Sequence, residues 1–140
     1  MGIEFRITKG PQRASGTTPA TGVIYTAIQS MATKDVIPVL DFSKIEVVLQ
    51  VFNLETNTAS VQVSLETSMQ EESDNSSAWL TVFSSGIISI PGRTFGVTAP
   101  ATPSSPTLLK YLRWTVVLTG TANSQAVAAT FELQGVARLG

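Results

Sequence analysis

Apolar and polar residues alternate strictly along the C-terminal part of this chain. Between residues 110 and 138, two stretches repeat the pattern, on either side of a turn-like segment around Gly120. A period of two residues is typical of a β-strand with one buried face. The pattern therefore predicts two long strands joined as a hairpin, in which Trp114 and Phe131 meet across the pair. The inward-facing positions are Leu112, Trp114, Val116 and Leu118 in the first strand, and Val127, Ala129, Phe131, Leu133 and Gly135 in the second.

The middle of the chain repeats this arrangement in residues 45–54 and 59–69. In the second stretch Val61, Val63, Leu65 and Met69 share one face. In the first stretch apolar residues occupy both faces, since Val48 and Phe52 lie opposite the main apolar row, which favours a central strand covered on both sides. The short polar segment between the two stretches predicts a second hairpin.

Shorter strand patterns occupy much of the remaining sequence. They cover residues 3–8, 23–28, 79–83, 86–90 and 93–97, while residues 31–35 read as a turn or a single helical turn. Pro38 interrupts residues 36–40 and predicts an edge or irregular segment, because proline lacks a backbone N–H. No stretch shows sustained helical periodicity. Many short strands separated by turn signals predict an all-β fold, an antiparallel β-sandwich of jelly-roll-like form.

The N-terminal segment lacks this periodicity. Residues 10–22 (GPQRASGTTPATG) are rich in Gly, Pro and small polar residues. Such a composition buries little apolar surface by itself, so the segment is expected to order on a neighbouring molecule or to fray as a chain end. The predicted organisation is an extended N-terminal arm over residues 1–21 and a single β-sandwich domain over residues 22–140.

Charge and composition exclude several functions. Charged residues make up 14% of the chain and the formal net charge is −1, whereas a typical soluble domain is about one-quarter charged. Without a basic run, binding to nucleic acid is not expected. Histidine and cysteine are absent, which removes the commonest general base and thiolate chemistry. No apolar run is long enough for a membrane-spanning helix, so no membrane partner is expected.

One polar cluster deserves a test as a metal site. Residues 71–77 form an acidic loop in which Glu71, Glu72, Asp74 and Asn75 offer oxygen ligands of the kind that calcium takes. The spacing does not match an EF-hand loop, and a solvated turn between strands explains it as well. No nucleophile motif or phosphate-binding loop is present either. The chain is therefore expected to be a non-enzyme without metal or cofactor.

Two segments resemble small structural proteins of tailed bacteriophages. In residues 61–83 (VQVSLETSMQEESDNSSAWLTVF) a strand leads to an acidic Ser-Asp turn, and a Trp opens the next strand. Residues 111–138 (YLRWTVVLTGTANSQAVAATFELQGVAR) resemble its usual sequel, which contains Tyr-x-Arg, a Gly-Thr turn and a closing Gly-x-x-Arg strand. Discoidin-like sugar- or lipid-binding sandwiches share a similar Tyr-Arg strand, but this chain is shorter and lacks their common disulfide.

The phage resemblance implies a virion protein on the outer capsid surface. By similarity, such a decoration or cement protein would bind the major capsid protein and copies of itself, commonly as a homotrimer. It would stabilise the shell by binding only the assembled lattice. The arm and the proline-rich loop 99–107 are the expected contact regions. The candidate contact residues are Phe5, Arg6, Gln12, Arg13, Pro100, Pro103 and Pro106.

Two other functions stay open on the sequence. A tail- or fibre-associated adhesion module would bind host carbohydrate, with Trp79 and Tyr111 as the aromatic platform for a glycan. A small tail or head–tail joining subunit would instead assemble into rings of subunits. A jelly-roll-like sandwich without catalytic residues is compatible with all of these functions, because a fold by itself does not specify a function.

Overall fold

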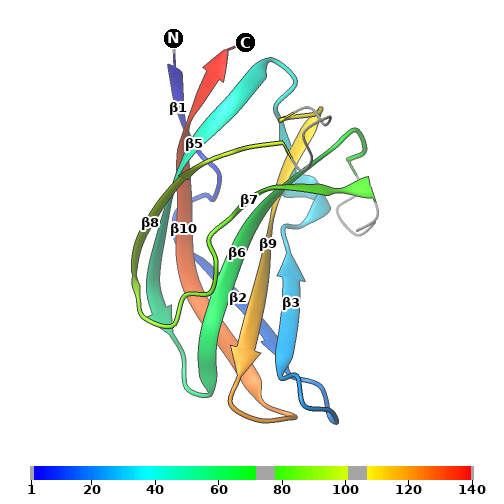
Figure 1. Cartoon of the computed structure of the whole chain (residues 1–140), viewed down its shortest axis with the longest axis vertical. Helices are drawn as coiled ribbons and strands as arrows, with labels where there is room; N and C mark the ends of the chain where they lie inside the picture. The colour runs from blue at the N-terminus through cyan, green and yellow to red at the C-terminus, as the bar shows by residue number, and fades with distance from the viewer. Residues whose placement is uncertain (1, 72–77, 101–106, 140) are drawn as a thin grey trace.

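The computed structural model describes residues 2–71, 78–100 and 107–139. Within them the chain forms two antiparallel sheets of five strands each, packed face to face as a β-sandwich (Figure 1). The elements are β1 (Gly2–Arg6), β2 (Gln12–Thr17), β3 (Thr26–Ser30), the 3-10 helix η1 (Thr33–Asp35), β4 (Ile37–Pro38), β5 (Phe42–Leu54), β6 (Thr58–Ser68), β7 (Leu80–Ser84), β8 (Gly92–Val97), β9 (Tyr111–Gly120) and β10 (Ala126–Leu139).

The strand order is that of a jelly roll. Sheet A runs β1–β10–β5–β8, with β2 also paired to β10, and sheet B runs β3–β9–β6–β7, with β4 also paired to β9. The strands β1 and β2 follow the same edge of β10, and β3 and β4 follow the same edge of β9, so each pair acts as one interrupted edge strand. With these pairs counted as single strands, the order corresponds to the double Greek key expected from the sequence.

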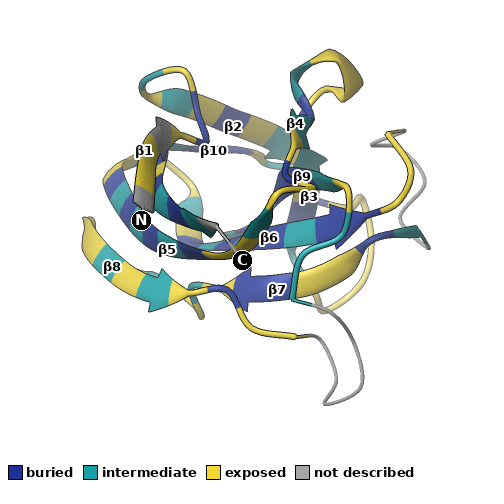
Figure 2. Ribbon diagram, turned by 90° about the horizontal axis from the view of Figure 1, so that it is seen from above, coloured by how far each residue is buried: buried dark blue, intermediate teal, exposed yellow. Residues whose placement is uncertain are grey.

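The alternating patterns identified the central part of the core correctly. Figure 2 shows the buried residues along the inner sides of both sheets, whereas β8 is exposed or half-buried along its length. The inward rows of β9 and β10 are buried as predicted, and the Trp114 and Phe131 rings meet edge to face with centroids 5.3 Å apart. The core also takes the inward rows of two further strands, which are Ile45, Val47, Leu49 and Val51 in β5 and Val61, Val63 and Leu65 in β6.

Both predicted hairpins are wrong. The strands β5 and β6 are consecutive but belong to different sheets, and so do β9 and β10. Each connection is therefore a corner that crosses from one sheet to the other, and Trp114 meets Phe131 across the core instead of along one sheet. Alternation shows that a strand has one buried face, but it does not distinguish side-by-side pairing from face-to-face packing, because both arrangements bury the same residues.

The N-terminal segment is extended, as predicted, but it is part of the sandwich and not a separate arm. Residues 2–6 pair with Arg138–Gln134 of β10, and residues 12–17 pair with Phe131–Ala126 of the same strand. Ile7, Thr8, Ala14 and Thr18 are buried. The segment orders because the free edge of β10 offers backbone hydrogen-bonding groups along its whole length, which a composition of small and polar residues does not reveal.

The structure also tests the predictions made for the short elements. The helical turn appears as η1, and Pro38 lies in the two-residue edge strand β4. The strand expected from residue 23 begins only at Thr26, and residues 86–90 make only an isolated bridge between Ile88 and Val61. The outward face of β5 is not covered, since Phe52 is 48% exposed, and Met69 points outward with 61% exposure. This open outward face of sheet A carries the candidate site.

Candidate functional site

The structure does not leave Trp79 available as a sugar platform. Its side chain is 5% exposed, and the Arg113 guanidinium lies over its ring, 4.6 Å from the centroid. Tyr111 is half-buried, with the Lys110 ammonium 5.5 Å from its ring centroid. Tyr111 begins β9 of sheet B and Trp79 immediately precedes β7 of the same sheet, and each ring lies next to a cation. The platform predicted from sequence therefore does not form an open aromatic surface.

Three of the predicted contact residues line cavities of the described structure. Arg6 and Gln12 border a small cavity between the N-terminal strands and β3, and Arg13 borders a larger groove beside β2. The backbone of Phe5 pairs with Gly135. Pro100 is exposed, and Pro103 and Pro106 lie outside the described residues. The structure thus brings Arg6 and Gln12 together at the first cavity.

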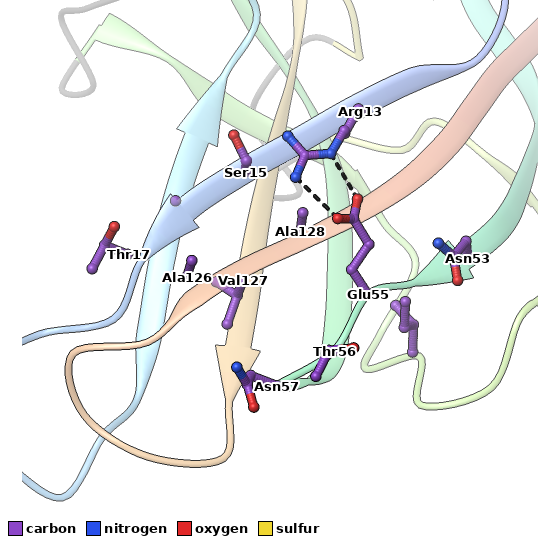
Figure 3. Close-up of a pocket in the computed structure, with 12 residues that line it drawn as sticks. Arg13, Ser15, Thr17, Asn53, Glu55, Thr56, Asn57, Ala126, Val127 and Ala128 are labelled. Atoms are coloured by element: carbon purple, nitrogen blue, oxygen red, sulfur yellow. Dashed lines mark hydrogen bonds and ion pairs between the residues drawn. The ribbon is translucent and has the colours of Figure 1, made fainter.

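The groove beside β2 has a volume of about 780 Å³. We call it the β2 groove (Figure 3). One wall comes from Arg13, Ser15 and Thr17 of β2, and the other from the β5–β6 corner at residues 53–57. The floor is the start of β10 at residues 126–128, where Ala126 and Ala128 provide small side chains. The hydroxyl and amide groups of the walls therefore surround a floor of small apolar side chains.

A two-point ion pair crosses the β2 groove. The Arg13 Nε donates to Glu55 Oε2 at 2.7 Å, and its Nη2 donates to Oε1 at 3.0 Å. The bridge passes over Ala128, which is only 3% exposed although it lies on the outward side of β10 (Figure 3). The hydrogen bond from Arg13 holds the pKa of the Glu55 carboxyl below its ordinary value, and the same bond raises the pKa of Arg13. The pair fixes the corner to β2.

A second groove runs along the outward side of sheet A, over β1, β10, β5 and β8. It consists of two adjoining hollows of about 490 and 340 Å³, which share Val48, Phe95 and Gln134. We call it the sheet A groove. Phe95 is 71% exposed and Phe52 48% exposed, and both line the smaller hollow. Val97 and Val136 extend the apolar surface into the larger hollow.

Polar side chains are arranged around these apolar residues. Arg93 Nε donates to Gln50 Oε1 at 2.7 Å, and Gln134 Nε2 donates to Glu132 Oε1 at 2.9 Å. At the far end, Arg138 pairs with Glu46 at 2.9 Å. These bonds hold the side chains in place before any ligand binds and leave further donors and acceptors on each group. The face therefore combines open aromatic rings with prearranged amide, guanidinium and carboxylate groups.

Sequence reasoning missed this groove, although part of its signal was present. Arg93, Phe95 and Val97 share one face of a stretch that was correctly predicted as a strand. The strand's partner was not known, so the outward side of β8 was not connected with the outward side of β5. Val48 and Phe52 were instead assigned to a covered face. The registers Val48↔Phe95 and Gln50↔Arg93 bring these side chains next to each other.

The described residues hold no cluster of three or more Asp or Glu side chains that could bind a metal ion. Most of the acidic loop proposed for calcium, including Glu72, Asp74 and Asn75, lies outside the described ranges. The same residues include no helix with the length and hydropathy needed to cross a membrane.

Comparisons with known proteins identify no family. No family model and no curated protein matches the chain. Among solved structures, one described as "CBM4 structure and function" is 14% identical, covers 93% of this chain and 83% of its own, and has a TM-score of 0.41. Another, described as "Structural basis for the promiscuous specificity of the carbohydrate-binding modules from the beta-sandwich super family", is 8% identical with a TM-score of 0.45. It covers 97% of this chain, and this chain spans about half (52%) of its length. Likeness at this level does not bear on function.

Proposed function

We propose that this protein is a non-catalytic carbohydrate-binding module that holds an oligosaccharide in the sheet A groove. The observation that carries the proposal is the pair of exposed phenylalanine rings, Phe52 and Phe95, in a hollowed sheet face. A pyranose ring has apolar C–H faces that pack against an aromatic ring, and its hydroxyl groups need donors and acceptors around the edge. Ligand sites commonly combine an apolar lining with a few placed polar groups in this way.

The polar groups of the groove suit hydroxyl recognition. Gln50 and Gln134 carry amides that both donate and accept, and Glu132 accepts only. Their hydrogen bonds with Arg93 and with each other fix the side chains on regular strands. Rigid placement reduces the conformational entropy lost on binding. The two adjoining hollows make the groove large enough for a chain of sugars and not only a single ring.

The test is a glycan array followed by calorimetric titration of the best ligand with the Phe95→Ala variant. Removal of an exposed ring that becomes buried on binding is expected to weaken affinity roughly tenfold to a hundredfold. Ile28→Ala is the matched control, because Ile28 is similarly exposed (69%) but lies on β3 of sheet B. Absence of any glycan ligand, or equal affinity of Phe95→Ala and the original chain, would reject the proposal.

A second candidate function is the decoration protein suggested by the phage resemblance. Exposed aliphatic residues outside the sheet A groove favour a protein partner. Val23 and Ile24 in the β2–β3 connection are 88% and 68% exposed, and Ile28 in the neighbouring β3 is 69% exposed. The proposed partners are the major capsid protein and two further copies of this chain, in a homotrimer on the outer capsid surface. Because the N-terminal strands pair with β10 and do not form a free arm, we expect the capsid contacts in this connection instead.

Light scattering and co-sedimentation with assembled phage heads test the second candidate. A trimer that sediments with heads, and loses this property when Val23 and Ile24 are both replaced by Ser, is the expected result. A monomer that stays in solution in the presence of heads would reject it. The glycan array and the sedimentation experiment give independent answers, so the two candidates are separable.

A further inference from the structure

Each sheet has one interrupted edge strand, β1/β2 in sheet A and β3/β4 in sheet B. In sheet A, residues 7–11 leave the edge of β10 opposite Glu132 and Leu133, between β1 and β2. In sheet B, residues 31–36, which include η1, leave the edge of β9 opposite Arg113 and Trp114. The two segments are joined by a long ion pair, with 3.8 Å between Lys9 Nζ and Asp35 Oδ1.

A cavity of about 240 Å³ lies between these two segments. Ile7, Met31 and Trp114 line it and are 3%, 4% and 4% exposed, so its deep side is part of the hydrophobic core. The segments are pinned by backbone bonds. Met31 N donates to Trp114 O at 3.0 Å, and Ile7 N and Thr8 N donate to Leu133 O at 3.0 and 3.2 Å. The cavity is therefore preformed, with an apolar floor.

The rim of the cavity is rich in hydrogen-bond donors. Arg6 lines it and makes no ion pair or hydrogen bond with a described residue through its side chain. Gln29 accepts a hydrogen bond from Ser15 N at 2.6 Å, which orients its amide and leaves its Nε2 to donate. Gln12 adds a second amide. The carboxylate on this rim, Asp35, is paired with Lys9, so the unpaired charge at the rim is positive.

We propose that this cavity binds a ring-sized organic carboxylate, with the ring on Trp114 and Met31 and the carboxylate on Arg6. The volume corresponds to about eight waters at ~30 Å³ each and lies below the ~300 Å³ at which typical ligand pockets begin. It therefore admits one ring and not an oligosaccharide. A guanidinium with free donors binds a carboxylate at two points. The site is separate from the sheet A groove and does not depend on the function proposed for it.

An acidic sugar and an aromatic acid share this chemistry, and a titration separates them. The probes are glucuronate and benzoate, with glucose and benzyl alcohol as neutral counterparts, and the readout is the NMR signal of the Trp114 indole N–H. One of the acids is expected to shift this signal saturably with a dissociation constant of about 1 mM, and its neutral counterpart is expected to bind at least tenfold more weakly.

Two charge variants of the rim are expected to change the affinity for the acid in opposite directions. A purely structural role of the two residues would not produce this difference. Arg6→Gln is expected to weaken binding of the acid about tenfold, whereas Asp35→Asn is expected to strengthen it, because it removes the negative charge of the rim. Arg93→Gln, in the sheet A groove, is the matched control and should leave the affinity for the acid unchanged. The proposal is overturned if neither acid shifts the signal at about 10 mM, if the neutral probes bind equally well, or if Arg6→Gln and Asp35→Asn change affinity in the same direction.

Discussion

Arg113 shows what a single buried residue contributes beyond the alternating pattern. It occupies an outward position of β9, yet it is 3% exposed. Trp79 covers its guanidinium, and Glu66 accepts from it at 2.8 Å while also accepting from Thr115 at 2.7 Å. A buried charge is tolerated only when it is paired and hydrogen-bonded. The residue expected to be a sugar platform is therefore the cover of a buried ion pair.

Trp114 is expected to be among the most important residues for stability. Its ring is buried against Phe131 between the two sheets. Trp114→Ala should therefore lower the free energy of unfolding by about 3–5 kcal/mol, the usual range for a large aromatic side chain in a core. Urea denaturation followed by circular dichroism measures this change. Phe95→Ala is the control, since that ring is 71% exposed, and it should stay within about 0.5 kcal/mol of the original chain.

Glu55 gives a prediction about pH. Its pKa in the folded chain lies below the ordinary value because Arg13 donates to it. A lowered carboxyl pKa contributes stability that is present above the unfolded pKa and is lost as the pH falls through the folded pKa. Arg13→Gln should raise the pKa of Glu55 towards its ordinary value, as measured by NMR titration of the carboxyl carbon. An identical Glu55 pKa in both proteins would contradict the ion pair.

At the scale of elements, close packing between the sheets depends on a glycine. Gly96 lies in β8, and a Cβ at this position would overlap the ring of Phe83 in β7, which is 8% exposed. Because this ring is held in the core, it has little freedom to move aside. Gly96→Ala is therefore expected to destabilise the fold by about 1–3 kcal/mol, as for other overpacked core positions, when measured by thermal or urea denaturation.

The same strand offers a matched control. Gly92 opens β8, and a Cβ there would meet no atom within 4 Å. Gly92→Ala should be neutral or slightly stabilising, because alanine has fewer conformations to lose on folding. If both variants were equally destabilised, the cause would be the loss of glycine from the strand and not the contact between β8 and Phe83.

For the whole molecule, the N-terminal strands close one side of the sandwich. Figure 1 shows β1 beside the C-terminal part of β10, so the two ends of the chain lie in one sheet. Deletion of residues 2–17 would remove buried Ile7 and Ala14 and would open the edge of β10. The truncated chain is expected to lose at least about 3 kcal/mol of stability and to aggregate through the free edge.

Thermal denaturation and light scattering of the truncated chain test this expectation. Replacement of Val23 and Ile24 by Ser is the control, because both side chains are exposed outside regular strands. An unchanged melting temperature after truncation would show that residues 2–17 are an arm independent of the domain. The experiment also matters for the decoration-protein candidate, since a loss of head binding after truncation would report unfolding unless the fold is checked first.

The sequence by itself determined the fold class, most strands and the central part of the core, which consists of the inward rows of β5, β6, β9 and β10. These features depend on which side chains leave water, and alternation along a strand records this directly. Only the tertiary structure decided which strands pair, because consecutive strands with one apolar face can lie side by side or face each other with the same residues buried. The sheet A groove, the β2 groove and the small cavity between the edge strands all combine residues far apart in the chain. Their geometry follows from long-range register, such as Val48 with Phe95, which no local pattern encodes.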